Sequence, residues 1–464
     1  MKYISTRGKA PAIEFEEVLL AGMAPDGGLY VPENYPQFSR EQMRKMRSLT
    51  YSELAAEIMA PFTAGYLSKR ELLEMAEQAY GCFSHSAVAP LKQIADGLWV
   101  MELFYGPTLA FKDYALQIVG RMFATVLKRS NRHITILGAT SGDTGSAAIE
   151  ACKGCPNLDV FILHPHNRVS EVQRRQMTTT IASNIYNIAL EGTFDDCQAI
   201  VKTLFADESF REEQHLSAVN SINWARIMAQ VVYYFRAALA LGAPDREVSF
   251  AVPTGNFGNI FAGYVAKRMG LPVRKLILGS NENDILPRFL ESGVMEKREV
   301  KPSISPSMDI QISSNFERLL FEVLDRNAAE VSRLMEMFKY EKTYSVKPEV
   351  LSKIRGIISG TRCSDEETKE QIRKIYAATG EIMDPHSSIG FAAADKFYEK
   401  EVPTIVLSTA HPSKFPFAVR DAIGITPALP SKLSDLMTRR ENFTVLPNTP
   451  DAIKYFIETA QRKA

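Results

Sequence analysis

Cysteine is scarce in this sequence, long hydrophobic runs are missing, and neither sign of charge is in excess. The 464 residues include five cysteines, so we expect no disulfide framework and a cytoplasmic, reducing location. No uncharged apolar run approaches the roughly 18 residues that cross a membrane. Because 54 Lys and Arg balance 54 Asp and Glu, we expect neither a nucleic acid nor a membrane surface as a main partner. No motif indicates an oligomeric state.

Motifs for metal binding and for serine hydrolysis are also missing. Cys152 and Cys155 form a CxxC pair, but no second Cys or His pair follows at zinc spacing. His164 and His166 have no third candidate ligand nearby. No G-x-S-x-G element occurs, which argues against a hydrolase elbow. We therefore predict no metal site.

Short apolar runs alternate with longer helical patterns through most of the chain after residue 90. Continuous apolar runs of this length fit strands of a sheet that is covered on both faces. Strand–helix alternation is typical of right-handed βαβ units. The sequence thus predicts the α/β class, with open, mostly parallel twisted sheets and helices on both faces. The predicted strands are Ile134–Ala139, Leu158–Leu163, Ile185–Leu190, Val248–Val252, Leu276–Leu278 and Thr404–Leu407.

Breaks in this rhythm suggest how the domains are organised. Apolar residues at helical spacing over Tyr51–Met59 and Lys69–Tyr80 predict helices in the N-terminal part. We expect a small N-terminal helical lobe over 1–90, two α/β lobes over 91–282 and 381–426 with the site between them, a helical insertion over 283–380, and a C-terminal wrapping tail over 427–464.

The loop Gly138–Gly145 follows a predicted strand and leads into a helix that we expect to begin near Ser146. In an open parallel sheet, ligands bind beyond the carboxyl ends of the strands. Glycines and hydroxyls at a helix start suit an anion, but the Asp143 carboxylate would compete with one. From these residues alone, a ligand site and a capped helix start are equal alternatives.

Two further loops and one lysine are candidates. Pro253–Asn259 places two Gly and two Asn between a strand and a helix, which suits a phosphate, with an ordinary turn as the alternative. It matches neither common nucleotide motif. Leu407–Pro412 offers small hydroxyls that contact a ligand or merely cap a helix. Lys112 is either a desolvated nucleophile or a surface lysine paired with Asp113.

These loops belong to a larger set of six segments that occur in one order along the chain. The segments are DGGLYVP (26–32), GPTLAFKD (106–113), TSGDTGSA (140–147), NSINWAR (220–226), PTGNFGN (253–259) and STAHP (408–412). Together they resemble threonine synthase in its long bacterial and fungal form. That family belongs to the pyridoxal-phosphate-dependent enzymes of fold type II, the tryptophan synthase β-like group. The resemblance spans nearly the whole chain.

The resemblance implies a role for each matching residue. Lys112 matches the lysine that is bonded to pyridoxal 5′-phosphate as an aldimine, and Thr409 matches the hydroxyl residue at the pyridine nitrogen. The residues that match the loop around the cofactor phosphate are Gly255, Asn256, Phe257, Gly258 and Asn259. The loop that faces the substrate carboxylate contains Ser141, Asp143 and Thr144, although many relatives have Asn in place of Asp143.

The same resemblance implies the reaction and its substrate. The family converts O-phospho-L-homoserine and water into L-threonine and phosphate, with the freed lysine acting as a general base. A dianionic substrate needs a cationic pocket, and we expect Arg226 to contribute to it, with a helix ion pair as the alternative. Three other outcomes remain: a phospho-lyase that releases 2-oxobutyrate, a related dehydratase, and a catalytically silent binding protein on the same scaffold.

Overall fold

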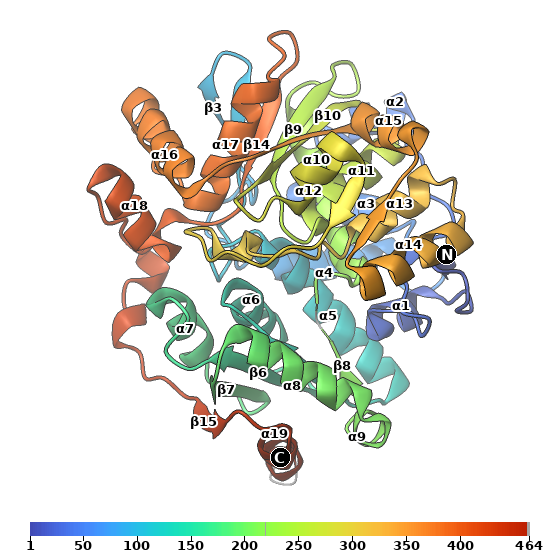
Figure 1. The fold of residues 1–464 in the computed structure, drawn as a ribbon, viewed down its shortest axis with the longest axis vertical. Coiled ribbons are helices and arrows are strands. Elements are labelled where there is room, and N and C mark those ends of the chain that lie inside the picture. Colours follow the sequence, from blue (N-terminus) through green and yellow to red (C-terminus); the bar gives the residue numbers. More distant parts are fainter. Residues whose placement is uncertain (219, 462–464) are drawn as a thin grey trace.

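The computed structural model describes residues 1–218 and 220–461, which form two α/β lobes around separate parallel sheets (Figure 1). The larger sheet has the strand order β13-β10-β9-β14-β4-β3, and the smaller has the order β15-β7-β6-β5-β8. Within these two sheets, every strand pairing is parallel except that of β3 with β4. The predicted α/β class with mostly parallel sheets is therefore confirmed.

The six predicted strands all form, within a few residues of the expected ends. In the larger sheet the strands are β3 (Leu91–Ala95), β4 (Leu98–Glu102), β9 (Val248–Pro253), β10 (Val273–Ser280), β13 (Ile358–Arg362) and β14 (Thr404–Ser408). In the smaller sheet they are β5 (Ile134–Ala139), β6 (Leu158–Pro165), β7 (Ile185–Glu191), β8 (Leu216–Ser217) and β15 (Thr444–Pro447).

Helices cover both faces of the smaller sheet. Ile134 and Ile136 of β5 pack with α5 and α6, whereas Leu137 faces α8, α9 and α19. These alternating contacts explain the apolar runs, since successive side chains of a strand point to opposite faces. The helices of this lobe are α5 (Lys112–Ser130), α6 (Asp143–Cys152), α7 (Glu171–Thr178), α8 (Phe194–Ala206), α9 (Glu208–Glu213) and α19 (Pro450–Gln461).

The larger sheet is covered in the same way. Phe250 and Val252 of β9 pack with α10 and α11, whereas Ala251 faces α16 and α17. The helices around this sheet are α10 (Trp224–Ala240), α11 (Gly258–Arg268), α12 (Ile285–Ser292), α13 (Phe316–Val323), α14 (Ala328–Glu341), α15 (Pro348–Ile357), α16 (Asp365–Thr379), α17 (Pro385–Phe397) and α18 (Pro416–Ile423). Short 3₁₀ turns are η1 (Pro306–Met308), η2 (Pro412–Lys414), η3 (Ser431–Leu433) and η4 (Leu436–Thr438).

The N-terminal part is mainly helical, as the spacing predicts. Helices α3 and α4 have the predicted bounds, and each begins at a capping box, Thr50 with Glu53 and Ser68 with Glu71. The four helices are α1 (Phe15–Ala21), α2 (Arg40–Met46), α3 (Tyr51–Met59) and α4 (Lys69–Tyr80). The two-stranded pairs of the molecule are β1 (Tyr3–Ser5) with β2 (Tyr30–Pro32), and β11 (Val294–Glu296) with β12 (Thr343–Ser345).

Two of the expected parts differ from the structure. Residues 283–380 are not purely helical, because β13 pairs with β10 and forms an edge of the larger sheet. The tail over 427–464 does more than wrap the body, because β15 pairs with β7 at an edge of the smaller sheet. Both strands lie at sheet edges and are partly exposed, so neither shows a continuous apolar run.

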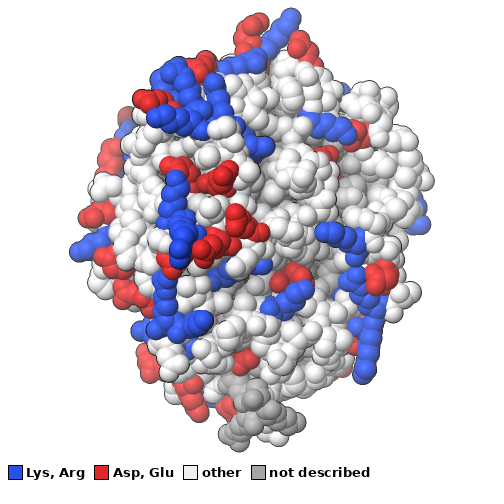
Figure 2. Space-filling view, turned by 180° about the vertical axis from the view of Figure 1, so that it is seen from behind, with Lys and Arg blue, Asp and Glu red and all other residues white. Residues whose placement is uncertain are grey.

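The surface matches the zero net charge of the chain. Basic and acidic side chains lie close to one another on the face in Figure 2, and neither sign covers that face alone. Within residues 1–218 and 220–461, no helix is both long and apolar enough to span a membrane.

Candidate active site

Lys112 is the first residue of α5, and its loop is attached to the loop that follows β14. The Phe111 amide donates to the Thr409 carbonyl at 2.9 Å, and the His411 amide donates to the Leu109 carbonyl at 3.0 Å. Leu109 has a φ of +61°, a backbone conformation that a leucine rarely adopts. Two candidates that are almost 300 residues apart in sequence, Lys112 and Thr409, are thereby brought together.

One of the two interpretations of Lys112 from the sequence is a surface lysine paired with Asp113. The structure does not show this pair. The Asp113 carboxylate accepts the Thr108 amide at 2.8 Å and the Thr108 hydroxyl at 2.6 Å. Burial raises the pKa of Asp113 to about 6, although these hydrogen bonds act in the opposite direction. Gly106 makes this turn possible, because a Cβ atom there would lie 2.4 Å from the Asp113 side chain. Asp113 therefore fixes the loop in front of Lys112.

The carboxylate that faces Lys112 is Asp143, at the start of α6. Lys112 Nζ lies 3.7 Å from Asp143 Oδ2. The other oxygen, Oδ1, accepts a hydrogen bond from Gln173 Nε2 at 2.8 Å and lies 3.1 Å from Lys414 Nζ. The Ser307 hydroxyl donates to Oδ2 at 3.3 Å. The two oxygens thus have separate sets of partners, and one set includes Lys112.

Charge and burial set the protonation states at this pair. Burial lowers the pKa of Lys112, the Asp143 carboxylate opposes that effect, and the cations Arg226 and Lys414 reinforce it. Burial alone would raise the pKa of Asp143, but Lys414 and then Lys112 outweigh burial and hold that pKa well below its usual range. Asp143 is therefore a carboxylate at neutral pH beside an amine that is easier to deprotonate than an exposed lysine.

The loop around Asp143 begins its helix earlier than expected. Helix α6 begins at Asp143 and not near Ser146, because the Thr140 hydroxyl accepts the amides of Gly142 and Gly145 at 3.0 and 2.9 Å. Gly142 has a φ of +145°, and a Cβ atom there would lie 2.6–2.8 Å from the Gln173 amide that holds Asp143. The neighbouring predicted residues Ser141 and Thr144 are partly exposed at the same turn.

The glycine-rich loop joins β9 to α11. Its central residue, Phe257, is left-handed at φ +63°, and α11 begins at Gly258. The first amides of a helix have no acceptor within the helix, so they are available to an anion. Asn259 is buried, and its Oδ1 accepts hydrogen bonds from the hydroxyls of Tyr233 and Tyr234 while its Nδ2 has no partner. Gly255 and Asn256 complete the loop, and their carbonyls accept bonds from Ser313 and from the backbone and side chain of Asn315.

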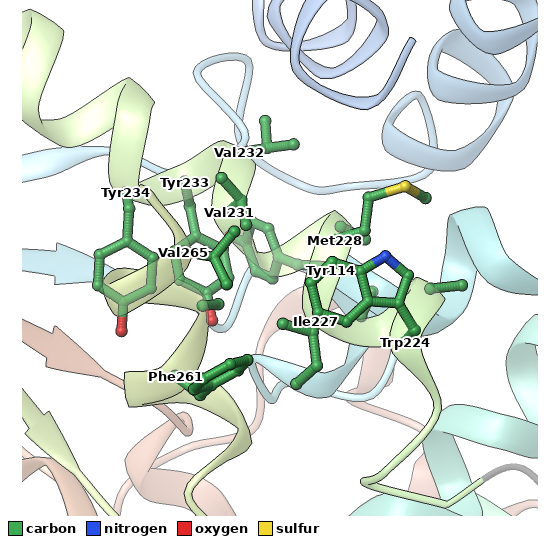
Figure 3. Close-up of a cluster of buried hydrophobic side chains, with 14 of the residues drawn as sticks. Tyr114, Trp224, Ile227, Met228, Val231, Val232, Tyr233, Tyr234, Phe261 and Val265 are labelled. Atoms are coloured by element: carbon green, nitrogen blue, oxygen red, sulfur yellow. The ribbon is translucent and has the colours of Figure 1, made fainter. Parts of the chain in front are cut away.

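Arg226 lies in the first turn of α10, a helix buried on nearly every side. Its neighbours in the core include Ile227, Met228 and Val231, which pack among aromatic rings (Figure 3). The Arg226 guanidinium is buried, and its Nε and Nη1 atoms have no hydrogen-bond partner. Burial lowers the pKa of Arg226 to about 10. The expected alternative of an ion pair within the helix does not hold, since no acidic partner of Arg226 occurs among residues 1–218 and 220–461.

Thr409 is hydrogen-bonded through its backbone to a buried polar cluster at the start of α17. Its amide donates to the Ser387 hydroxyl at 3.0 Å, and that hydroxyl donates in turn to Asp384. Asp384 also caps α17 and contacts His386 Nδ1 at 2.9 Å. The Thr409 side chain is therefore attached to a backbone that is fixed on both sides.

The donor set of this site fits pyridoxal phosphate. A mostly buried lysine, a helix start preceded by a Gly/Asn loop, and a buried hydroxyl residue supply an amine, an anion cradle and a hydrogen-bonding group. The unpartnered atoms of Arg226 and Asn259 are donors, and a phosphate supplies acceptors that such buried donors need. We assign the phosphate cradle to the Gly255–Asn259 loop, and the amine to Lys112, as proposals.

Sequence reasoning missed Lys414, Gln173 and the Asp384 cluster. Lys414 is fully buried, and its partners Thr108 and Gln176 lie 306 and 238 residues away in sequence. Lys414 comes two residues after the segment Ser408–Pro412. Nothing in the spacing of apolar residues there predicts that this lysine is buried. The fold alone reveals this residue.

Comparisons with known proteins agree with the cofactor that this donor set fits. A family model described as "Pyridoxal-phosphate dependent enzyme" matches residues 85–337. Models described as "Threonine synthase N terminus" and "Threonine synthase, C-terminal" match residues 2–80 and 387–457.

Individual relatives match over almost the whole chain. Threonine synthase from Pseudomonas aeruginosa is 55% identical over 459 residues, with 98% of each chain covered. The crystal structure of pyridoxal-phosphate-bound threonine synthase from Brucella melitensis is 53% identical and superposes with a TM-score of 0.98 over 100% of both chains. Threonine synthase from yeast is 40% identical, with a TM-score of 0.95 over 100% of this chain and 99% of that one.

The fold and the donor set define an α/β enzyme that depends on pyridoxal 5′-phosphate. Within that class, sequence identity above 50% over the full length of two threonine synthases identifies the family. The chain belongs to the threonine synthase family.

Proposed function

We propose that this chain converts O-phospho-L-homoserine and water into L-threonine and phosphate, as the last step of threonine formation. The observation that carries the proposal is the charge of the site: Lys112 is faced by two buried cations, Arg226 and Lys414, and one carboxylate, Asp143. A buried excess of positive charge in a chain of zero net charge favours anionic ligands. A cofactor phosphate and a substrate phosphate meet that requirement.

Lys112 would act as the general base toward the substrate when both substrate and cofactor are bound. Its lowered pKa supports this role, because a base must be neutral to accept a proton. It removes the proton at Cα and then one at Cβ before the γ-phosphate leaves. A proton must also reach Cγ, where threonine carries a methyl group. Water then adds at Cβ, and Cα regains its proton before threonine is released. When bound, pyridoxal phosphate supplies an electron sink for the negative charge at Cα.

The remaining residues bind and orient. The loop Gly255–Asn259 would hold the cofactor phosphate, and the Thr409 hydroxyl would serve as the hydrogen-bonding partner of the pyridine nitrogen. Ser141 and Thr144, at the helix start beside Asp143, bind the substrate carboxylate. Arg226 binds the substrate phosphate with its two unpartnered nitrogens. Asp143 was expected in the set that binds substrate, but its position against two lysines supports a role toward the Lys112 amine instead.

Product analysis tests this proposal. We expect purified protein with pyridoxal phosphate to release threonine and phosphate from O-phospho-L-homoserine in equal amounts. Phosphate accompanied by 2-oxobutyrate would contradict the synthase and indicate a phospho-lyase. Absence of phosphate release from cofactor-loaded protein would indicate a silent binding protein or a different substrate.

The variant Lys112→Ala tests the assignment of the lysine. We expect it to lose the absorbance band of lysine-bound cofactor and at least about 10³-fold in turnover, because both the covalent attachment and the base are gone. Lys128→Ala, at the last turn of the same helix, is the matched control. A retained band in Lys112→Ala would show that another amine holds the cofactor.

We also propose that the protein works in the cytoplasm. All five cysteines are free thiols, which fits a reducing compartment.

A further inference from the structure

Lys414, in η2 after β14, is a lysine with no exposure to solvent. Its ammonium donates to the Thr108 carbonyl and to Gln176 Oε1, each at 2.6 Å, and pairs with Asp143 Oδ1 at 3.1 Å. Three acceptors match the three protons of an ammonium. A buried ammonium is costly unless it is paired in this way, so Lys414 is held as a cation.

Lys112 is held far more loosely. Its side chain retains 13% exposure, and its nearest charge partner is Asp143 Oδ2 at 3.7 Å. One carboxylate therefore lies between two lysines: the closer pair is with Lys414, and the longer pair is with Lys112. Coulomb attraction falls with distance, so Lys414 contributes more than Lys112 to keeping Asp143 ionised.

We infer that Lys414 is a positioning residue that acts through Asp143. It serves as the permanent counter-ion of that carboxylate and fixes Oδ1, together with Gln173, so that Oδ2 faces the Lys112 amine. Asp143 then stays a carboxylate whether Lys112 is protonated or neutral. This inference rests on the proposed role of Lys112 as the lysine that bonds to the cofactor.

The arrangement sets how readily the Lys112 amine loses its proton. The groups that face it are Asp143 from α6, Arg226 from α10 and Lys414 from η2, while its neighbour Asp113 is occupied by Thr108. Without Lys414, one nearby cation is gone and the whole charge of Asp143 acts on Lys112. Both effects favour the protonated amine, so both raise the pKa of Lys112.

The test measures how fast the cofactor-free protein binds pyridoxal phosphate at different pH values. The Lys112 amine must be neutral to condense with the aldehyde, a reaction that releases water. We expect Lys414→Met to move the pH profile to higher pH and to slow binding by about tenfold at a fixed pH below the midpoint. Asp143→Asn removes the stabilising carboxylate and should move the profile to lower pH.

Two further variants separate charge from packing. Gln176→Met removes a neutral partner of Lys414 and should leave the midpoint of the profile in place. In the Asp143→Asn background, Lys414→Met should shift the profile less than it does in the wild type, because its main route is lost. Lys414→Gln, which keeps a donor without the charge, replaces Lys414→Met if that variant does not fold.

The outcomes distinguish this inference from the proposed function. A wild-type profile in the uncharged Lys414 variant, or equal shifts with and without Asp143, would overturn the role of Lys414. Covalent binding that survives in Lys112→Ala would instead overturn the proposed function, whatever the Lys414 variants show.

Discussion

Replacing Arg226 by methionine should weaken substrate binding and stabilise the cofactor-free protein. Methionine keeps the length and apolar character of the side chain but removes the charge. In the folded protein, burial lowers the pKa of Arg226 from its usual value to about 10. A depressed pKa means that folding disfavours the charged form, and this penalty is fully present at neutral pH. At 1.36 kcal/mol per pKa unit it amounts to about 3 kcal/mol.

The expected loss of substrate affinity follows from the two unpartnered nitrogens of Arg226, Nε and Nη1. A charge-assisted hydrogen bond contributes about 1.5–3 kcal/mol, so losing one effective interaction with the substrate phosphate should raise KM by about 10- to 150-fold. The free energy of unfolding of the cofactor-free protein should rise by about 1–3 kcal/mol, since the charge penalty disappears. Steady-state kinetics with O-phospho-L-homoserine and urea unfolding measure the two effects.

The matched control is Arg236→Met, on the same helix but partly exposed and bonded to the Leu49 carbonyl. It should leave KM unchanged. An unchanged KM in Arg226→Met would refute the assignment of Arg226 to the substrate. Weaker cofactor binding at an unchanged KM would place Arg226 at the cofactor phosphate instead.

Two other predictions concern the turn in front of Lys112. Asp113 has a pKa of about 6 in the folded protein, so the fold binds its proton more tightly than the unfolded chain, and the free energy of unfolding falls as pH rises from about 4 to 6. Asp113→Asn should therefore be about 1–3 kcal/mol more stable than the wild type at pH 7 and equally stable near pH 4. Urea unfolding at the two pH values measures this difference in stability. A difference that does not change with pH would contradict this reasoning. Gly106→Ala places a Cβ atom 2.4 Å from the Asp113 side chain, so it should cost about 1–3 kcal/mol in thermal unfolding and displace Lys112. Its control is Gly356→Ala, at an exposed glycine of α15 where a Cβ atom would meet no atom within 4 Å. Full activity of Gly106→Ala would show that this contact does not position Lys112.

Sequence patterns predict the buried strands well and the edge strands poorly. Central strands such as β5 and β9 are covered on both faces, so they appear as mainly apolar runs. The edge strand β13 ends in the exposed Arg362, and β15 is a four-residue strand in which Val445 and Pro447 are exposed. Their pairing depends on the neighbouring strand, which local sequence does not contain.

The candidate site shows the same limit. The glycine loop carries a local pattern of its own, whereas Lys112 is singled out from other lysines only by the family resemblance. Lys414 has no such pattern, because its burial arises from three acceptors that the fold brings from other elements. The sequence also leaves open whether the loop at Asp143 binds a ligand or only caps a helix, because a carboxylate there would compete with an anion. The structure removes that objection by placing two lysines beside Asp143, which neutralise its charge.

The two lysines at Asp143 illustrate how one buried site keeps a fixed charge and a changeable one. Lys414 has all its protons bonded and no solvent, so losing its proton would leave three acceptors without a donor. Lys112 has one long contact and partial exposure, so its proton can leave without breaking a network. A reaction that moves protons between neighbouring carbon atoms needs an amine of the second kind. The first kind keeps the carboxylate beside it charged throughout, and Arg226 remains free to bind a phosphate.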